Sequence, residues 1–223
     1  MSGYYEDKLS AERLRRCYEI APPRIRQYLK TEVDFVIQCI GGSGRVLELG
    51  CGYGRVMEQL GGQTRDVLGC DTSRSSLRLA KNYLGLVPNV EFACADAIRL
   101  PFREGAFGVT FCVQNGISSF GVNQQRLVTE AARVTRVGGL VMFSSYSSKI
   151  WKERVAWFRL QAQAGLIGEI DEAKTRGGTI VCKDGFRTAT MSGRKFEKLF
   201  TEAGLNPRIR ELEGSSLFCL ARK

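Results

Sequence analysis

Three glycines at alternate positions follow an acidic residue, a pattern that could bind a small polar ligand. Glu48 lies in the apolar run 46–49, and the chain continues as Gly50-Cys51-Gly52-Tyr53-Gly54. Glycines let the backbone turn tightly and approach a ligand without interference from a Cβ atom. A glycine-rich turn alone is a weak signal, but an acid two residues before G-x-G-x-G is a much stronger one.

Two further acids end apolar runs downstream. Asp71 ends a second run 17 residues after Gly54, and Asp96 ends a third. An acid in the first position can accept hydrogen bonds from the hydroxyls of a ribose, and one in the second from an adenine amino group. If these runs are adjacent parallel strands, the three acids meet at one edge of a sheet. The pattern favours a cofactor that contains adenosine.

A nicotinamide dinucleotide is the alternative cofactor with a similar glycine-rich turn. Its fingerprint requires G-x-G-x-x-G, with a small third residue that lets the helix pack closely. Counted from Gly50, that third position is Arg55, and an acid at position 48 is foreign to the fingerprint. The sequence therefore disfavours NAD.

The chain has no histidine, which limits the chemistry of any site. Its eight cysteines form no C-x-x-C pair, so we expect no metal site. A general base would have to be a carboxylate, Tyr, Lys, Cys or water, and no catalytic residue is identified. Cys70, Cys94 and Cys112 fall in apolar runs and are expected to be buried, reduced thiols.

Apolar runs and helical periodicities alternate along the middle of the chain. Helical spacing precedes residues 41–44, whose glycines should end that helix. The expected strands are 45–49, 66–70, 90–95, 107–113 and 140–144, the last preceded by a turn at Gly138-Gly139. Such alternation predicts parallel strands joined by helices.

The regular alternation of predicted strands and helices ends after residue 146. We expect a helix over 149–164, paired extended segments near 179–182 and 186–190, and a helix that Gly204 ends. Segments 207–212 and 216–221 then predict a terminal hairpin.

Residues 45–146 resemble the core of the class I S-adenosylmethionine (SAM)-dependent methyltransferases. The similarity lies in residues 48–54, 69–73, 95–102, 107–120 and 133–140. It implies an α/β fold, a doubly wound seven-stranded sheet in the order 3-2-1-4-5-7-6, with the last-numbered strand antiparallel and helices on both faces. A single domain is expected, made of an N-terminal helical cap (1–44), a SAM-binding core (45–146), a substrate-side insertion (147–191) and a C-terminal helix and hairpin (192–223).

The resemblance also implies which residues bind SAM and the product S-adenosylhomocysteine. Gly50, Cys51 and Gly52 would line the methionine part, Asp71 and Thr72 the ribose, Asp96 and Ala97 the adenine, and Gln114 and Asn115 the sulfonium. Glu48 and Gly54 complete the predicted set.

The fourth-strand loop indicates the kind of methyl acceptor. Enzymes of this class that act on base nitrogens or glutamine amides usually carry Pro-Pro-Tyr after an Asn or Asp, whereas this chain reads Gln114-Asn115-Gly116-Ile117. We therefore predict a small-molecule acceptor. The expected substrate-side residues are Tyr18, Arg24, Asn115, Ile117 and Tyr146. A thiol-dependent methylation through Cys17 or Cys182 remains open.

The formal charge of +10 leaves a second hypothesis. From residue 146 onward, 15 Lys and Arg outnumber 9 Asp and Glu. An RNA methyltransferase that uses this basic third is therefore an alternative, as is a SAM-binding protein without catalysis. The polar, acidic first residues resemble no signal peptide, and no run is long enough to span a membrane, so a cytoplasmic location is expected.

Overall fold

The computed structural model describes residues 4–42, 44–64 and 66–223. Ser43, within the predicted end of the first long helix, lies outside the described residues. The helices are α1 (Tyr4–Asp7), α2 (Ala11–Glu19), α3 (Pro23–Ile40), α4 (Met57–Leu60), α5 (Arg74–Leu84), α6 (Gly116–Ser119), α7 (Gln124–Val134), the 3-10 helix η1 (Ser148–Ile150), α8 (Trp151–Gln163) and α9 (Gly193–Glu202). The strands are β1 (Arg45–Leu49), β2 (Asp66–Asp71), β3 (Val90–Cys94), β4 (Phe107–Cys112), β5 (Thr135–Tyr146), β6 (Thr179–Val181), β7 (Arg187–Ala189), β8 (Arg208–Leu212) and β9 (Ser216–Arg222).

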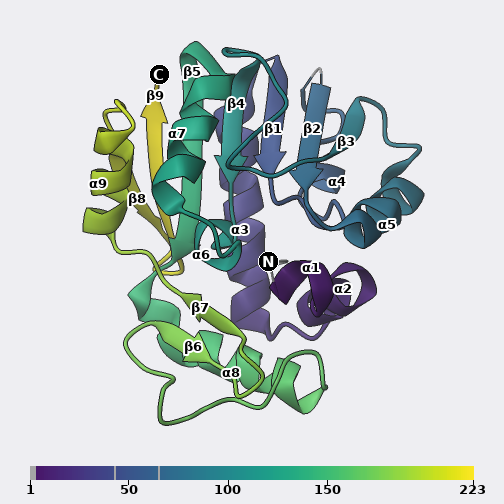
Figure 1. Ribbon diagram of the computed structural model, residues 1–223, viewed down its shortest axis with the longest axis vertical. Helices are drawn as coiled ribbons and strands as arrows, with labels where there is room; N and C mark the ends of the chain where they lie inside the picture. The colour runs from purple at the N-terminus through teal and green to yellow at the C-terminus, as the bar shows by residue number, and fades with distance from the viewer. Residues whose placement is uncertain (1–3, 43, 65) are drawn as a thin grey trace.

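The main sheet has seven strands in the order β3-β2-β1-β4-β5-β9-β8 (Figure 1). The first five are parallel, and β9 runs antiparallel to both of its neighbours. Counted within this sheet alone, the order is the predicted 3-2-1-4-5-7-6 with the last strand antiparallel. The small hairpin β6–β7 is a separate, antiparallel sheet, also as predicted.

Local sequence signals set where the helices begin. Pro23 is the first residue of α3, a position where its missing N–H costs no hydrogen bond. The side chains of Ser73, Asn123 and Ser192 cap α5, α7 and α9 by accepting a backbone N–H in the first turn. These caps fix the helices that cover the sheet.

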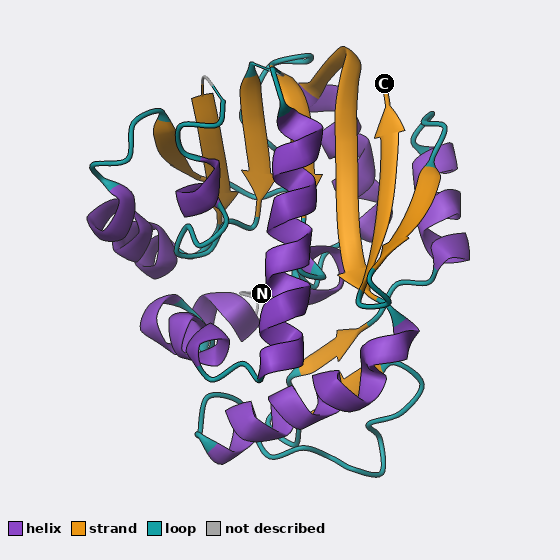
Figure 2. Cartoon of the chain, turned by 180° about the vertical axis from the view of Figure 1, so that it is seen from behind, coloured by secondary structure: helices purple, strands orange, loops and turns teal. Residues whose placement is uncertain are grey.

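Helices cover both faces of the sheet. One apolar cluster joins the sheet to α7 and α9, and a second joins it to α3, α4 and α5. Figure 2 shows α3 crossing the second face and continuing beyond the ends of the strands.

The part of α3 beyond the sheet belongs to a cap. A third apolar cluster joins α2, the first half of α3, α8 and the β6–β7 hairpin, and Trp157 of α8 donates a hydrogen bond of 2.9 Å to the carbonyl oxygen of Cys17. This cap lies below the carboxyl ends of β1, β2 and β4 in Figure 1. No described helix combines the length and the apolar character needed to cross a membrane.

The prediction of a turn at Gly138-Gly139 is wrong. β5 begins directly after α7 at Thr135, and its register with β4 shifts between the pairs Phe107–Thr135 and Val109–Leu140, so the glycines lie in a bulge within the strand. A Cβ atom on Gly139 would approach the carbonyl oxygen of Gly108 to 2.7 Å. A close backbone approach, rather than a turn, explains that glycine.

Candidate functional site

A cavity of about 290 Å³ lies between the carboxyl ends of β1 to β4 and the first two helices. Its walls come from the glycine turn, the ends of β2 and β3, the loop after β4, and α1–α2. It brings together nine of the eleven residues that the sequence predicted for the cofactor, namely Glu48, Gly50, Cys51, Gly52, Asp71, Thr72, Asp96, Ala97 and Gln114. Gly54 and Asn115 do not line it.

The glycine turn has the backbone conformation that the sequence pattern predicted. Gly50, Gly52 and Gly54 have φ values of +73°, +54° and +86°, which side-chain-bearing residues rarely adopt. A Cβ atom on Gly50 would lie 2.2 Å from Cζ of Phe120, a residue of the cavity wall. Gly50 is therefore required both for the turn and for the space beside Phe120.

Asp71 ties β2 to this turn. Its Oδ2 accepts a hydrogen bond of 2.9 Å from the backbone N–H of Gly52, and its Oδ1 accepts one of 2.8 Å from that of Ser73. A carboxylate can accept about four hydrogen bonds in all. The side chain borders the cavity next to Thr72, where it could bind vicinal hydroxyls.

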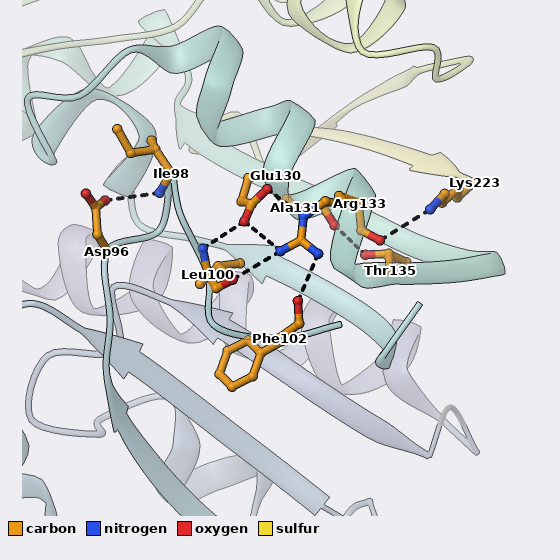
Figure 3. A network of polar contacts seen from close by, with 9 residues as sticks. All are labelled: Asp96, Ile98, Leu100, Phe102, Glu130, Ala131, Arg133, Thr135 and Lys223. Atoms are coloured by element: carbon orange, nitrogen blue, oxygen red, sulfur yellow. Dashed lines mark hydrogen bonds and ion pairs between the residues drawn. The ribbon is translucent and has the colours of Figure 1, made fainter. Parts of the chain in front are cut away.

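The segment that carries Asp96 and Ala97 is held from α7. The carboxylate of Glu130 accepts the N–H of Leu100 at 2.7 Å, and Arg133, paired with Glu130, donates to the carbonyl oxygens of Leu100 and Phe102 (Figure 3). Asp96 itself accepts the N–H of Ile98 at 3.1 Å, which closes a tight turn. The hydrogen bond from Arg133 lowers the pKa of the Glu130 carboxyl below its usual value.

The loop after β4 contains two consecutive left-handed residues, Gln114 and Asn115, with φ values of +56° and +63°. The backbone N–H of Gln114 donates to Glu32 Oε2 at 2.7 Å and to Ser144 Oγ at 2.9 Å. Gln114 lines the cavity, and its buried Nε2 has no hydrogen-bond partner among the described residues. This amide is thus available to a ligand.

Asn115 faces away from the cavity. Its Nδ2 donates to Thr188 Oγ1 and to the carbonyl oxygen of Ala189, both at 3.0 Å, and its Oδ1 accepts from Ser145 Oγ at 2.6 Å. The predicted contacts of Asn115 with the sulfonium and the acceptor are therefore corrected, because its whole amide anchors β7 to β5.

A carboxyl group and a guanidinium group with buried, unsatisfied atoms lie beside the glycine turn. Oε2 of Glu48, and Nε and Nη2 of Arg55, are buried without hydrogen-bond partners in the described part of the chain. Burial raises the pKa of Glu48 to about 8, against an opposing effect of the Arg55 charge. The guanidinium lies 4.8 Å from the ring centroid of Tyr18.

The predicted substrate residues are dispersed. Tyr18 lines the cavity from α2. Arg24, in contrast, lies on the surface and donates hydrogen bonds to Gln27 Oε1 and to the carbonyl oxygen of Glu213. Ile117 is buried in the core, and Tyr146 stacks on Tyr28 with centroids 4.7 Å apart. Of this set, only Tyr18 borders the cavity.

Sequence reasoning missed several residues of the cavity wall, from the first two helices, from the end of the glycine turn and from the loop after β4. Tyr5, Leu14, Arg55, Ser119 and Phe120 all line the cavity. In the sequence, Arg55 stood out only because it departs from the dinucleotide fingerprint. Tyr5 and Leu14 reach the cavity because α1 and α2 fold over it. No spacing signal could have placed those two.

The cysteines give one further correction. Cys70 and Cys112 are buried free thiols as predicted, but Cys94 is exposed because β3 is an edge strand. Cys17 and Cys182 are buried in the cap and do not line the cavity, which removes support for a thiol-dependent reaction.

Comparison with known proteins adds to this geometry. A family model described as "Methyltransferase domain" matches residues 46–139. Among curated proteins, the chain is 29% identical over 141 residues to the methyltransferase GfsG of Streptomyces halstedii, covering 61% of this chain and 47% of that protein. It is 26% identical over 140 residues to a demethylmenaquinone methyltransferase of Paenarthrobacter aurescens, covering 61% of this chain and 53% of the relative. The matches thus span about half the length of these relatives.

The fold matches solved structures over nearly its whole length. A SAM-dependent methyltransferase from Aquifex aeolicus superposes with a TM-score of 0.62 at 15% sequence identity, covering 93% of this chain and 96% of that one. At this identity the likeness concerns the fold, and it includes the cap as well as the core.

Proposed function

We propose that the protein transfers the methyl group of SAM to a small-molecule acceptor, because residues 46–139 match a family model described as "Methyltransferase domain" and the fold resembles that of a SAM-dependent methyltransferase. The observation that carries the proposal is the cavity itself. Glu48, Asp71 and Asp96 surround it at the ends of three adjacent strands, next to a glycine turn that leaves room for a ligand.

The residues present fit SAM. Asp71 offers carboxylate lone pairs for the two ribose hydroxyls, with Thr72 beside it, and Asp96 with Ala97 offers a site for the adenine. The turn at Gly50–Gly52, beside the unsatisfied Glu48 carboxylate, would hold the methionine part.

The chemistry would be an in-line displacement. SAM, when bound, supplies an electrophilic methyl group on a sulfonium sulfur. The task of this chain is then to fix the cofactor, to align the acceptor and to exclude water. The free Nε2 of Gln114 could orient an acceptor oxygen, and helices α1 and α2 cover the cavity from solvent. None of these steps requires a general base.

Two observations support a small acceptor over RNA. The cavity is bordered on its outer side by Tyr5, Leu14 and Tyr18, so the acceptor would meet an aromatic cap rather than an open basic groove. The arginines Arg208 and Arg222, of the basic C-terminal third, line a different hollow near β9. The demethylmenaquinone methyltransferase among the relatives is named for a small substrate, in line with this choice.

A binding and transfer experiment tests the proposal. Nuclease-treated protein is titrated with SAM by calorimetry, with NAD as the control ligand, and is then incubated with methyl-labelled SAM and either a metabolite extract or total RNA. We expect saturable SAM binding, no NAD binding, and label in the metabolite fraction. Absence of SAM binding would overturn the cofactor assignment, and label in RNA alone would overturn the acceptor class.

A further inference from the structure

Glu48 and Arg55 place a carboxyl group and a guanidinium group against one cavity without an ion pair between them. Both residues line the cavity, and neither takes part in an ion pair among the described residues. Glu48 Oε2 and Arg55 Nε and Nη2 are buried and lack hydrogen-bond partners. Buried charged groups are normally hydrogen-bonded, so this arrangement indicates a ligand that satisfies both.

The position of Arg55 is fixed by aromatic residues. Its guanidinium carbon lies 4.8 Å from the ring centroid of Tyr18, and that ring packs against Tyr53 and Trp157 with centroids 6.1 Å away in each case. Stacking on a ring leaves the edge of a guanidinium free for hydrogen bonds. Nε and Nη2 share one edge, which matches the two oxygens of a carboxylate.

The opposite wall offers the complementary group. A carboxylate such as Glu48 accepts hydrogen bonds from an ammonium, which has three donors. One ligand group carries an ammonium and a carboxylate on a single carbon, namely an α-amino acid head. The glycine turn at residues 50–54 lies between the two side chains in sequence and leaves the space that such a head requires.

Resting on the proposed function, in which Glu48 takes the ammonium of the methionine part of SAM, we propose that Arg55 is a specificity-determining residue that binds the carboxylate of that part through Nε–H and Nη2–H. Arg55 thereby separates whole SAM and S-adenosylhomocysteine from adenosine thioethers that lack the amino acid head. Its stacking on Tyr18 also links the occupied head to α2 of the cap.

The test compares two ligands that differ in the head alone. S-adenosylhomocysteine and 5′-methylthioadenosine are titrated by calorimetry into wild type, Arg55→Met and Arg55→Lys. We expect Arg55→Met to lower the affinity for S-adenosylhomocysteine about tenfold or more, and to leave the affinity for 5′-methylthioadenosine within about twofold of wild type. Arg55→Lys keeps the charge without the paired donors and should fall in between.

Arg78→Met is the matched control. Arg78 is exposed on α5 and does not line the cavity, so the same loss of charge there should alter neither affinity. If each of the variants Arg55→Met and Arg55→Lys lowers the affinities for the two ligands by the same factor, or lowers neither affinity, the assignment of Arg55 is wrong. If wild type binds neither ligand, the proposed function itself fails, which is a distinguishable result.

Discussion

The backbone N–H of Gly52 and the carboxylate of Asp71, 19 residues apart, are joined by a hydrogen bond of 2.9 Å. The acid that should bind the ribose therefore also holds the glycine turn that should accept the methionine part. The ribose-binding part and the methionine-binding part of the proposed cofactor site are therefore connected by this hydrogen bond.

This link predicts that Asp71→Asn acts on both halves. An amide has one acceptor oxygen where a carboxylate has two. It therefore cannot accept hydrogen bonds from the N–H groups of Gly52 and Ser73 and also from two hydroxyls. We expect the affinity for 5′-methylthioadenosine, which retains the ribose, to fall about tenfold or more. Calorimetry measures this, with circular dichroism to establish folding, and an unchanged affinity would contradict the role of Asp71.

Gly50→Ala should be more harmful than a glycine replacement of equal backbone strain. A positive φ alone costs about 1–2 kcal/mol, but at Gly50 the new Cβ also meets Phe120. Gly62 has φ +81° with open space around it, so Gly62→Ala serves as the control. Urea denaturation should show a larger loss for Gly50→Ala, and Phe120→Leu should partly restore it. Equal losses at the two glycines would argue against the close contact.

Arg133→Met should weaken cofactor binding without touching the cavity. Arg133 and Glu130 hold the segment 96–102 from α7, and Arg133 does not line the cavity. Because Arg133 is partly exposed, we expect a stability loss of only about 1–2 kcal/mol, with a weaker affinity for SAM. Arg126→Met, on the exposed side of the same helix, is the comparison that should leave both unchanged.

Binding of S-adenosylhomocysteine should release a proton near neutral pH. Burial raises the pKa of Glu48 to about 8, so this carboxyl is mostly protonated at pH 7, and an ammonium beside it favours ionisation. Affinity should therefore rise with pH up to about 8. Calorimetry in buffers of different ionisation enthalpy measures the released proton. Glu48→Gln should abolish the release, and its persistence in that variant would assign it elsewhere.

The free energy of unfolding should fall as pH rises through neutrality. Burial raises the pKa of Glu32 from 4.5 to about 7, so between these values the folded state binds more protons than the unfolded state and stability declines. Glu32→Gln should remove the part of this slope below pH 7, while Glu48 continues to contribute up to about pH 8. Urea titrations across this range measure both slopes, and an unchanged slope in Glu32→Gln would be inconsistent with the buried carboxyl.

The positions of the parallel strands could be predicted because strands buried on both faces leave uninterrupted apolar runs, whereas the order of the sheet followed from the resemblance to the methyltransferase core. The run 45–49 became β1 with four of its five residues buried. Cys94 shows the limit of that reasoning, since an edge strand carries the same residue types with less burial. The bulge in β5 also escaped, because two glycines signal a turn as readily as a close backbone approach.

The acids at the strand ends of the site were predictable, whereas the contacts between the glycine turn and the cap were not. Glu48, Asp71 and Asp96 stand at strand ends, where chain order fixes their neighbours. Arg55 and Tyr18 meet only because α2 folds over the glycine turn, and Asn115 turns away because of a left-handed backbone that its sequence neighbours do not signal. Glu32 falls within an amphipathic helix, where an acid is usually exposed.

The antiparallel strand β9 has a consequence for the path of folding. β5 pairs on one side with β4 and on the other with β9, and η1, α8, β6, β7, α9 and β8 are synthesised between β5 and β9. Among the residues that the structure describes, β8 pairs in the sheet with β9 alone. Until β9 is inserted, the outer edge of β5 exposes unpaired backbone groups, and closing this long loop is entropically costly. Insertion of β9 is thus expected to be a late and rate-limiting event, during which an intermediate with an open sheet edge is prone to aggregate.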